Sequence, residues 1–410
     1  MSDAPADDEL LQRFAPLFET IREGAVRREL ERELPRAEVR ALADAGFGAL
    51  RLPPAEGGSG ASIPQLTRLV SALAAADSNV AHLWRGHFGF VELLLLRPDS
   101  AERRAWFERI AAGAIVGNAT SEQTGNTLAD IQSTVTETSG RWLLNGTKFY
   151  STGTLYSDWV YSAAGRADAA GAVERVTFAV RTDAPGVTVV DDWDGFGQKH
   201  TASGTTRFVD VEVDPTTISS YRDAPLSHIQ AFYQLYLVAV VTGIAAAVER
   251  DTVDFVRPRT RTYIHANTAR PGDDPQVLEV VGRLSAAAFA TAAVTQAAAG
   301  LLAVATATNV PGEGVERTRL DAAENAVYQA QVHVLEATLE AATRMFEVGG
   351  ASATYRERAL DRHWRNARVV ASHNPAIYKY RTVGAYALDG RGPVDVWDAY
   401  GTVGRTEFRA

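Results

Sequence analysis

The stretch Asp361-Arg-His-Trp-Arg-Asn-Ala-Arg-Val-Val-Ala-Ser-His-Asn-Pro375 combines a helical register with one imidazole at the end of the predicted helix. At about 100° per residue, one face of that helix carries Arg362, Asn366, Val369, Val370 and His373. The residue before a proline disfavours the α conformation, so the helix is predicted to end at about His373. The negative end of the helix dipole favours a protonated imidazole there. His373 is therefore either a proton donor or base that works near neutral pH, or a histidine that only caps carbonyl groups.

The regions around this helix alternate in character along the chain. From residue 225 to the end the sequence is helical and rich in alanine, and residues 8–112 show apolar spacings of three and four that also predict helices. Between them, residues 114–219 contain short β-branched and aromatic runs that predict strands, and Asn145-Gly146 is the strongest signal for a hairpin turn. We therefore expect three domains: helices in 1–112, a β domain in 113–223 and a helical bundle in 224–410.

The composition excludes several classes of function. The 410 residues include 46% hydrophobic residues, enough for a large core, and the net charge of -9 without any lysine or arginine run argues against nucleic acid. The absence of cysteine excludes disulfides, thiolate catalysis and cysteine-bound zinc. The acidic N-terminus has no signal-peptide pattern, so a cytoplasmic protein is expected.

Two uncharged stretches, 224–248 and 284–310, are long enough to raise the question of a membrane. Polar residues interrupt the first, and the second is mostly alanine and threonine. Both are predicted to be buried helices of a tight bundle, with no membrane span.

Two weaker patterns lead to no functional site. Gly57-Gly-Ser-Gly60 lacks the lysine and the preceding strand of a phosphate-binding loop, so a turn is expected. His82 and His87 are five residues apart and are predicted to lie on different faces of a helix, which argues against a metal pair. We predict no metal site.

Three segments in the β region carry residues suited to a planar ligand. They are Gly117–Glu122, Gly146–Gly153 and Asp191–Gly204. Small hydroxyl side chains, amides and glycines allow backbone donors to approach the hydrogen-bonding edge of a conjugated ring, and the indole of Trp193 could pack on its face. Taken alone, each segment could also be a loop with a capping residue.

In this order, the three segments make the chain similar to the acyl-CoA dehydrogenase superfamily. That resemblance implies an α+β fold with an N-terminal helical domain, a central β-barrel domain and a C-terminal four-helix bundle. The ordinary dehydrogenases have a catalytic glutamate where this chain has Asn374, and an amide cannot remove a carbon-bound proton. Gly-Asn-Ala-Thr-Ser-Glu, Asn-Gly-Thr-Lys and Ser-His-Asn-Pro-Ala-Ile-Tyr-Lys instead resemble the dibenzothiophene monooxygenase group, which takes reduced flavin from a separate reductase.

The resemblance implies roles for individual residues. The expected catalytic residues are His373, Asn118 and Thr152. The expected flavin-binding residues are Trp193, Tyr150, Ser121, Arg261 and Ser352. The expected substrate pocket contains His87, Gly86, Val370 and Asn374, and it is smaller and more apolar than that of the dibenzothiophene enzyme, which has a tyrosine at the position of Gly86 and a histidine at that of Val370. For Arg261, which would bind the flavin phosphate, a solvated basic helix face is an equal alternative.

The function implied is oxygenation of a small, mostly apolar substrate, at sulfur or at nitrogen. Reduced flavin, FMN or else FAD, would react with O2 to give a C4a-hydroperoxide, with His373 handling its proton and Asn118 and Thr152 holding it. The implied partners are a flavin reductase and further copies of the chain in a dimer or tetramer. An acyl-CoA dehydrogenase and a non-catalytic helical binding protein remain the alternatives.

Overall fold

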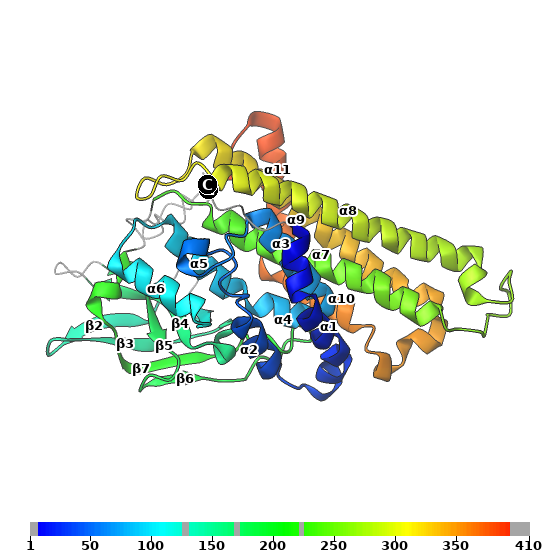
Figure 1. Ribbon diagram of the computed structural model, residues 1–410, viewed down its shortest axis with the longest axis horizontal. Coiled ribbons are helices and arrows are strands. Elements are labelled where there is room, and N and C mark those ends of the chain that lie inside the picture. The colour runs from blue at the N-terminus through cyan, green and yellow to red at the C-terminus, as the bar shows by residue number, and fades with distance from the viewer. Residues whose placement is uncertain (1–6, 125–130, 168–172, 221–224, 394–410) are drawn as a thin grey trace.

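The computed structural model describes residues 7–124, 131–167, 173–220 and 225–393 (Figure 1). The N-terminal helices are α1 (Asp7–Glu31), α2 (Arg36–Asp44), α3 (Ile63–Ala76), α4 (Ser78–Leu83), α5 (Arg85–Leu96) and α6 (Ala101–Ala111). A capping box begins α3, because the Ser62 hydroxyl accepts from the backbone of Gln65 and the Gln65 side chain accepts from the backbone of Ser62. Asp77 both ends α3 and caps α4, so the chain turns sharply there and carries His82 inward.

The β domain follows directly. Its strands are β1 (Val116–Ala119), β2 (Thr134–Thr138), β3 (Arg141–Lys148), β4 (Trp159–Ala167), β5 (Val173–Arg181), β6 (Val187–Val189), β7 (Thr206–Glu212) and β8 (Ser219–Ser220). The order in the sheet is β6-β7-β3-β2-β4-β5-β8, with β1 parallel to β4. Apolar side chains from β1 to β5 and β7 meet in one core, as in a barrel, although β6 and β8 are not paired with each other in the described residues.

The predicted hairpin turn at Asn145-Gly146 is wrong. Both residues lie inside β3, where the pairing with β7 shifts register between Leu144 and Gly146. Gly146 has φ 152°, and a Cβ there would lie 2.1 Å from Oγ of Ser133, so glycine serves a bulge at this position. The turn between β2 and β3 is made by Ser139 and Gly140, with φ 52° and 78°.

The C-terminal helices are α7 (Ile229–Val256), α8 (Pro275–Thr306), α9 (Arg317–Arg344), α10 (Arg362–His373) and α11 (Ala376–Asp389). Side chains of α7 and α9 share one continuous core with those of α1 to α5. Figure 1 shows the β domain at one end of the molecule and the connection between α7 and α8 at the other. The predicted boundary between residues 223 and 224 lies outside the described residues.

The two uncharged stretches behave differently. Both α7 and α8 contain an 18-residue window apolar enough to cross a membrane, but that window is 89% buried in α7 and only 28% buried in α8. The prediction that both are buried is therefore right for α7 and wrong for α8. In a single chain α8 leaves large apolar side chains exposed, and these include Leu278, Phe289, Leu301 and Val304.

Candidate active site

His373 is the last residue of α10, as predicted from Pro375, because Asn374 leaves the helix with φ -133° and ψ 105°. Its side chain is exposed to solvent although three neighbours surround it. Nη1 of Arg85 lies 3.4 Å from its Nε2, the amide of Asn374 lies 3.2 Å from its Nδ1, and the ring of His82 meets it edge-on at a centroid distance of 6.0 Å. His373 thus lies at the surface, where it contacts Arg85 and His82.

The sequence predicted the wrong charge for this imidazole. Burial among protein atoms, the Arg85 guanidinium and the neighbouring His82 hold the pKa of His373 well below its usual range, against a smaller opposite effect of a backbone hydrogen bond. The full charge of Arg85 at the ring nitrogen outweighs the partial charges of a helix end. His373 is therefore neutral at pH 7, with a lone pair on Nε2, because an arginine can only donate.

A series of hydrogen bonds, joined through the residue Gln198, leads from His82 into the β domain. Nδ1 of His82 donates to Oε1 of Gln198 over 3.0 Å, and the backbone oxygen of Gln198 accepts from the hydroxyl of Thr201 over 2.8 Å. The Thr201 and Ser203 hydroxyls are 2.8 Å apart, as are those of Ser203 and Thr152. Thr152 lies at one end of this series, and His82, at the other end, meets His373 through the edge-on ring contact.

His82 itself is buried and neutral. Desolvation, followed by the charge of Arg85, lowers its pKa to about 4. Since Nδ1 donates to Gln198, Nε2 is left as an acceptor, and it has no partner among the described residues. A buried acceptor with no partner costs free energy, which a ligand that donates to it would offset.

The predicted flavin-edge loops are brought together at the Thr152 end of these hydrogen bonds. A buried ion pair between Glu122 and Lys148, 2.5 Å, joins the first loop to the second. Ser121 forms a β-bridge with Phe149. Tyr150 follows with φ 58°, and its exposed ring lies edge-on to the half-buried ring of Trp193 at 6.2 Å.

Asn118 and Gly86 are also neighbours. A Cβ placed at Gly86 would lie 2.7 Å from Cβ of Asn118, so glycine allows α5 to pack against β1. The hydroxyl of Thr154 donates to the backbone oxygen of Asn118, which holds β1 against the loop that carries Thr152. The half-buried Asn118 side chain thus lies between the start of α5 and the second flavin-edge loop.

The other predicted pocket residues differ in how freely they could meet a substrate. His87 is fully buried, its Nε2 bonds to the carbonyl of Gly48 and its Nδ1 accepts from the backbone of Val116, so neither ring nitrogen is free for a substrate. Val370 is buried one turn before His373 on the same face of α10. The amide of Asn374 donates to Gln234 over 3.1 Å, which places it next to the imidazole but gives it a structural partner.

Arg261 and Ser352 lie apart from the rest of the site. The guanidinium groups of Arg259 and Arg358 lie over the ring of Phe255 near the end of α7, and Arg358 also donates to the backbone oxygen of Ser352. The pKa of Arg259 is lowered first by burial, then by the charge of Arg358 and then by the charge of Arg261, so Arg261 lies near this group. His373 lies instead beside Tyr233 near the start of α7, because Arg85 contacts both. At about 1.5 Å per residue, these two groups are about 33 Å apart along α7, farther than one flavin can reach.

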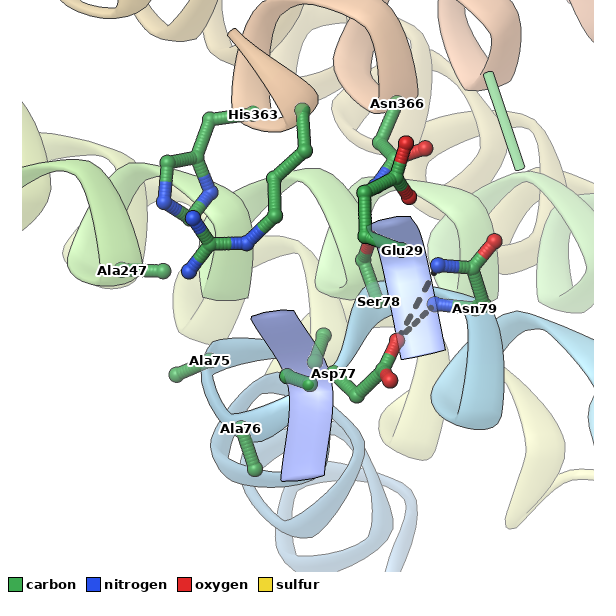
Figure 2. Close-up of a pocket in the computed structure, with 12 residues that line it drawn as sticks. Glu29, Ala75, Ala76, Asp77, Ser78, Asn79, Ala247, His363 and Asn366 are labelled. Atoms are coloured by element: carbon green, nitrogen blue, oxygen red, sulfur yellow. Dashed lines mark hydrogen bonds between the residues drawn. The ribbon is translucent and has the colours of Figure 1, made fainter. Parts of the chain in front are cut away.

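A second hollow lies behind Gln198. Figure 2 shows it between α10 and the turn from α3 to α4, with Asp77 accepting from the backbone and side chain of Asn79. Alanines and several groups with partners line it. Asp77 binds Arg28, and His363 binds Asp251. Glu29 also lines it, and Oε2 of Glu29 is buried without a partner among the described residues.

Sequence reasoning missed His82, Gln198 and Arg85. Helical spacing compares residues within one helix, whereas His82 is on α4 and contacts a residue 291 positions later in the chain. Asn366 gave a usable signal, since it shares a helix face with His373 and its Oδ1 accepts from the backbone of Gln198 over 2.6 Å. Among the described residues, no group of three histidine or acidic side chains could hold a metal ion.

Comparison with known proteins agrees with this geometry. The acyl-CoA dehydrogenase family models match residues 10–114 (N-terminal domain), 118–211 (middle domain) and 235–376 (C-terminal domain). The dibenzothiophene monooxygenase of Rhodococcus erythropolis is 30% identical over 408 residues, which is 95% of each chain.

Two solved structures have the same fold. FMN-bound TdsC from Paenibacillus sp. A11-2 superposes with a TM-score of 0.87 and 26% identity, covering 94% of this chain and 98% of its own. The methanesulfinate monooxygenase MsuC from Pseudomonas fluorescens gives 0.85 and 28%, covering 93% and 97%. The chain therefore belongs to the acyl-CoA dehydrogenase family and, within it, to the flavin-dependent monooxygenase branch that contains the dibenzothiophene monooxygenases.

Proposed function

We propose that this chain is a cytoplasmic FMN-dependent monooxygenase that receives reduced FMN from a separate reductase and adds one oxygen atom of O2 to the sulfur of a small organic substrate. The observation that carries the proposal is the path from the His373 and His82 pair through Gln198, Thr201 and Ser203 to Thr152, beside the loop of Trp193. The names of the relatives above, which refer to dibenzothiophene and to methanesulfinate, support sulfur as the oxygenated atom.

The residues present fit a flavin ring. Trp193 offers a half-buried indole whose Nε1 is tied to the carbonyl of Gly197 over 3.3 Å, so its ring is held in place for stacking. Asn118, Ser121 and Thr152 provide donors along the edge of the ring, and Tyr150 borders Trp193. When bound, reduced FMN supplies the two electrons that reduce O2.

The two histidines would manage the proton of the reaction. Both are neutral. Nε2 of His82 has no partner among the described residues and can accept a proton and return it, whereas Nε2 of His373 accepts from Arg85 and would have to give up that contact to do so.

The flavin phosphate would be bound by Arg261 of a second copy of the chain. In one chain Phe255, beside the arginines near Arg261, is about 33 Å along α7 from Tyr233, which contacts Arg85 next to His373, at 1.5 Å per residue. The exposed apolar side chains of α8 offer a surface for such a partner. We therefore propose a homo-oligomer, a dimer or a tetramer, in which each flavin site is completed by a neighbour.

An acyl-CoA dehydrogenase would need a base near the flavin. Asn374 occupies the expected position, and its amide bonds to Gln234 and lies against His373. Since an amide cannot take up the α-proton of a thioester, oxygenation accounts for these residues better than dehydrogenation.

Anaerobic mixing of the protein with reduced FMN, followed by O2 and a sulfur compound, tests the proposal. We expect a flavin transient that outlives the one seen with free reduced FMN, together with an oxygenated product. Flavin oxidation as fast as in free solution and no product from any sulfide, thiophene or sulfinate would refute it. Reduction of an electron acceptor by an acyl-CoA would instead support the dehydrogenase.

A further inference from the structure

Gln198 is a buried residue whose backbone is strained. Its φ is 51°, in the left-handed region that residues other than glycine rarely adopt. Its backbone N–H donates to Oδ1 of Asn366 over 2.6 Å, and its backbone oxygen accepts from the hydroxyl of Thr201 over 2.8 Å. Strained conformations persist only where the surrounding structure determines them, and they cluster at functional sites. The fold therefore keeps Gln198 in place at a cost.

The side chain of Gln198 connects the imidazole of His82 to the hydroxyl of Ser78. Its Nε2 donates to Oγ of Ser78 over 3.1 Å, and its Oε1 lies 3.0 Å from Nδ1 of His82. Both partners are buried, as is Gln198 itself. Rotation of the amide would break the two hydrogen bonds together, so the amide is fixed relative to the ring.

One of two possible arrangements of these hydrogen bonds is favoured. The hydroxyl of Ser78 can donate or accept, so the amide can present either its oxygen or its nitrogen to the ring. If the oxygen faces Nδ1, the ring proton is on Nδ1 and Nε2 has a lone pair. If the nitrogen faces Nδ1, the proton must be on Nε2, which is buried and has no partner among the described residues. In proteins a buried N–H without an acceptor is rarer than a buried acceptor without a donor, which favours the proton on Nδ1.

The charged groups near His82 keep its ring neutral but do not choose between its nitrogens. The titratable side chains that the described residues place next to the ring are Arg85 and His373. Desolvation, followed by the charge of Arg85, lowers the pKa of His82 to about 4, against a smaller opposite effect of Gln198. The neutral ring then carries one proton. Gln198 is its only hydrogen-bond partner in the part of the chain that the structure describes, so Gln198 decides which nitrogen holds that proton.

We propose that Gln198 is a positioning residue that keeps the ring proton of His82 on Nδ1, so that Nε2 is the proton acceptor during oxygenation. This inference rests on the proposed function, in which His82 accepts a proton and returns it. A neutral ring with its proton on Nε2 has no lone pair there and could not do so. In serine proteases the partner that sets the tautomer of the catalytic histidine contributes about 10⁴-fold to turnover. An amide sets the tautomer without adding a negative charge, so the imidazole stays unprotonated at pH 7.

Nitrogen NMR of the full chain labelled with 15N-histidine tests the tautomer directly. The signals of His82 are identified by their absence in His82→Gln. We expect a protonated Nδ1 and a bare Nε2 in the wild type. In Gln198→Met, which keeps the length of the side chain but has no oxygen, the proton should be shared between both nitrogens. Gln198→Glu should restore the proton on Nδ1, because its carboxylate accepts the same hydrogen bond.

The control is Gln12→Met, an exposed position on α1, which should leave the signals unchanged. A proton on Nε2 in the wild type would overturn the proposal, and so would an unchanged tautomer in Gln198→Met. If Gln198→Met does not fold, the wild-type spectrum and Gln198→Glu decide.

Turnover distinguishes positioning from packing. In Gln198→Met the product formed per O2 consumed should fall at least about tenfold at every pH. In Gln198→Glu the added negative charge should raise the pKa of His82, so product formation should be low at pH 7 and recover toward pH 9, where the ring loses its extra proton. Equal losses in both variants, independent of pH, would show that Gln198 only packs. A wild type with its proton on Nδ1 that oxygenates no sulfur compound would disprove the proposed function and leave the tautomer assignment standing.

Discussion

His82 and His373 face each other edge-on, with ring centroids 6.0 Å apart, although they come from opposite ends of the chain. Arg85 lowers the pKa of both rings. Two neutral imidazoles and one guanidinium therefore lie together, and protonation of either ring would place a second positive charge beside Arg85. Both imidazoles therefore remain unprotonated at neutral pH.

Replacing His373 should disrupt oxygenation more than flavin binding. In His373→Ala we expect product formation to fall about 10²- to 10⁴-fold, the usual contribution of a general acid or base. Oxidation of reduced FMN should continue and release hydrogen peroxide. The measurement is product formed per O2 consumed, with His333→Ala, an exposed histidine on α9, as the control. Full coupling in His373→Ala would remove the proposed role.

The stability of the protein should fall between pH 7 and pH 5. The pKa values of His82 and His87 are lowered to about 4 by burial, so the unfolded chain binds more protons than the folded chain below about pH 6.5. Each histidine should lower the free energy of unfolding by on the order of 1–2 kcal/mol over this range. Urea denaturation at the two pH values measures the difference, and it should be smaller in His87→Gln.

That pH range is chosen because the buried carboxyl groups titrate below it. Arg51 and His228 overcome desolvation and lower the pKa of Glu92 to about 2, so its stabilising contribution is lost only in more acidic solution. A free energy of unfolding that is flat from pH 7 to pH 5 would show that the histidines are not held neutral by the fold.

Gly86→Ala should damage the site through Asn118. The new methyl group would lie 2.7 Å from Cβ of Asn118, so either α5 or β1 must shift. A displacement of about 1 Å at a positioned donor costs up to about 10²-fold in rate, so we expect a 10- to 100-fold loss of turnover. Gly384→Ala on α11 is the matched control, since a Cβ there meets no atom within 4 Å. Equal activity of the two variants would contradict the packing argument.

Arg261→Gln should weaken FMN binding about 10- to 100-fold, the usual effect of losing a hydrogen bond to a charged group. Titration of FMN fluorescence measures it, and Arg270→Gln, whose charge pairs within its own loop, should bind normally. Mixed oligomers test whether Arg261 acts across the interface. Chains with Arg261→Gln and chains with His373→Ala should be weak alone but active when assembled together, because half of the sites then have both residues. Mixtures as inactive as their components would place Arg261 in its own chain's site or outside any site.

Features that depend on nearby residues in the sequence, such as helix ends and strands, were predicted well. Pro375 predicted the end of α10, and β-branched runs predicted strands from β2 to β7. The rules failed where a distant group decided the outcome. Gly146 looked like a turn, but it lies at a register shift between β3 and β7, and Ser133, just before β2, leaves no room for a Cβ there.

The same limit applied to the site. The helix dipole suggested a protonated His373, yet burial, followed by a guanidinium from α5, lowers the pKa of His373 and reverses the preference. His82 could not be paired with His373 by any spacing, because they lie on different helices, α4 and α10, far apart in the chain. The resemblance to known monooxygenases named the β-domain residues, whereas no local pattern indicated Arg85, which contacts residues far from it in the chain.

The length of α7 has a consequence for how the enzyme would respond to dilution. The 28-residue helix α7 separates the region of Arg261 from the proposed catalytic histidines of the same chain. If a neighbouring subunit completes the site, binding of FMN also stabilises the contact between the subunits. The apparent affinity for FMN should then rise with protein concentration, and FMN in turn should shift the chain toward its assembled form. Control of subunit assembly would in this way also be control of flavin occupancy.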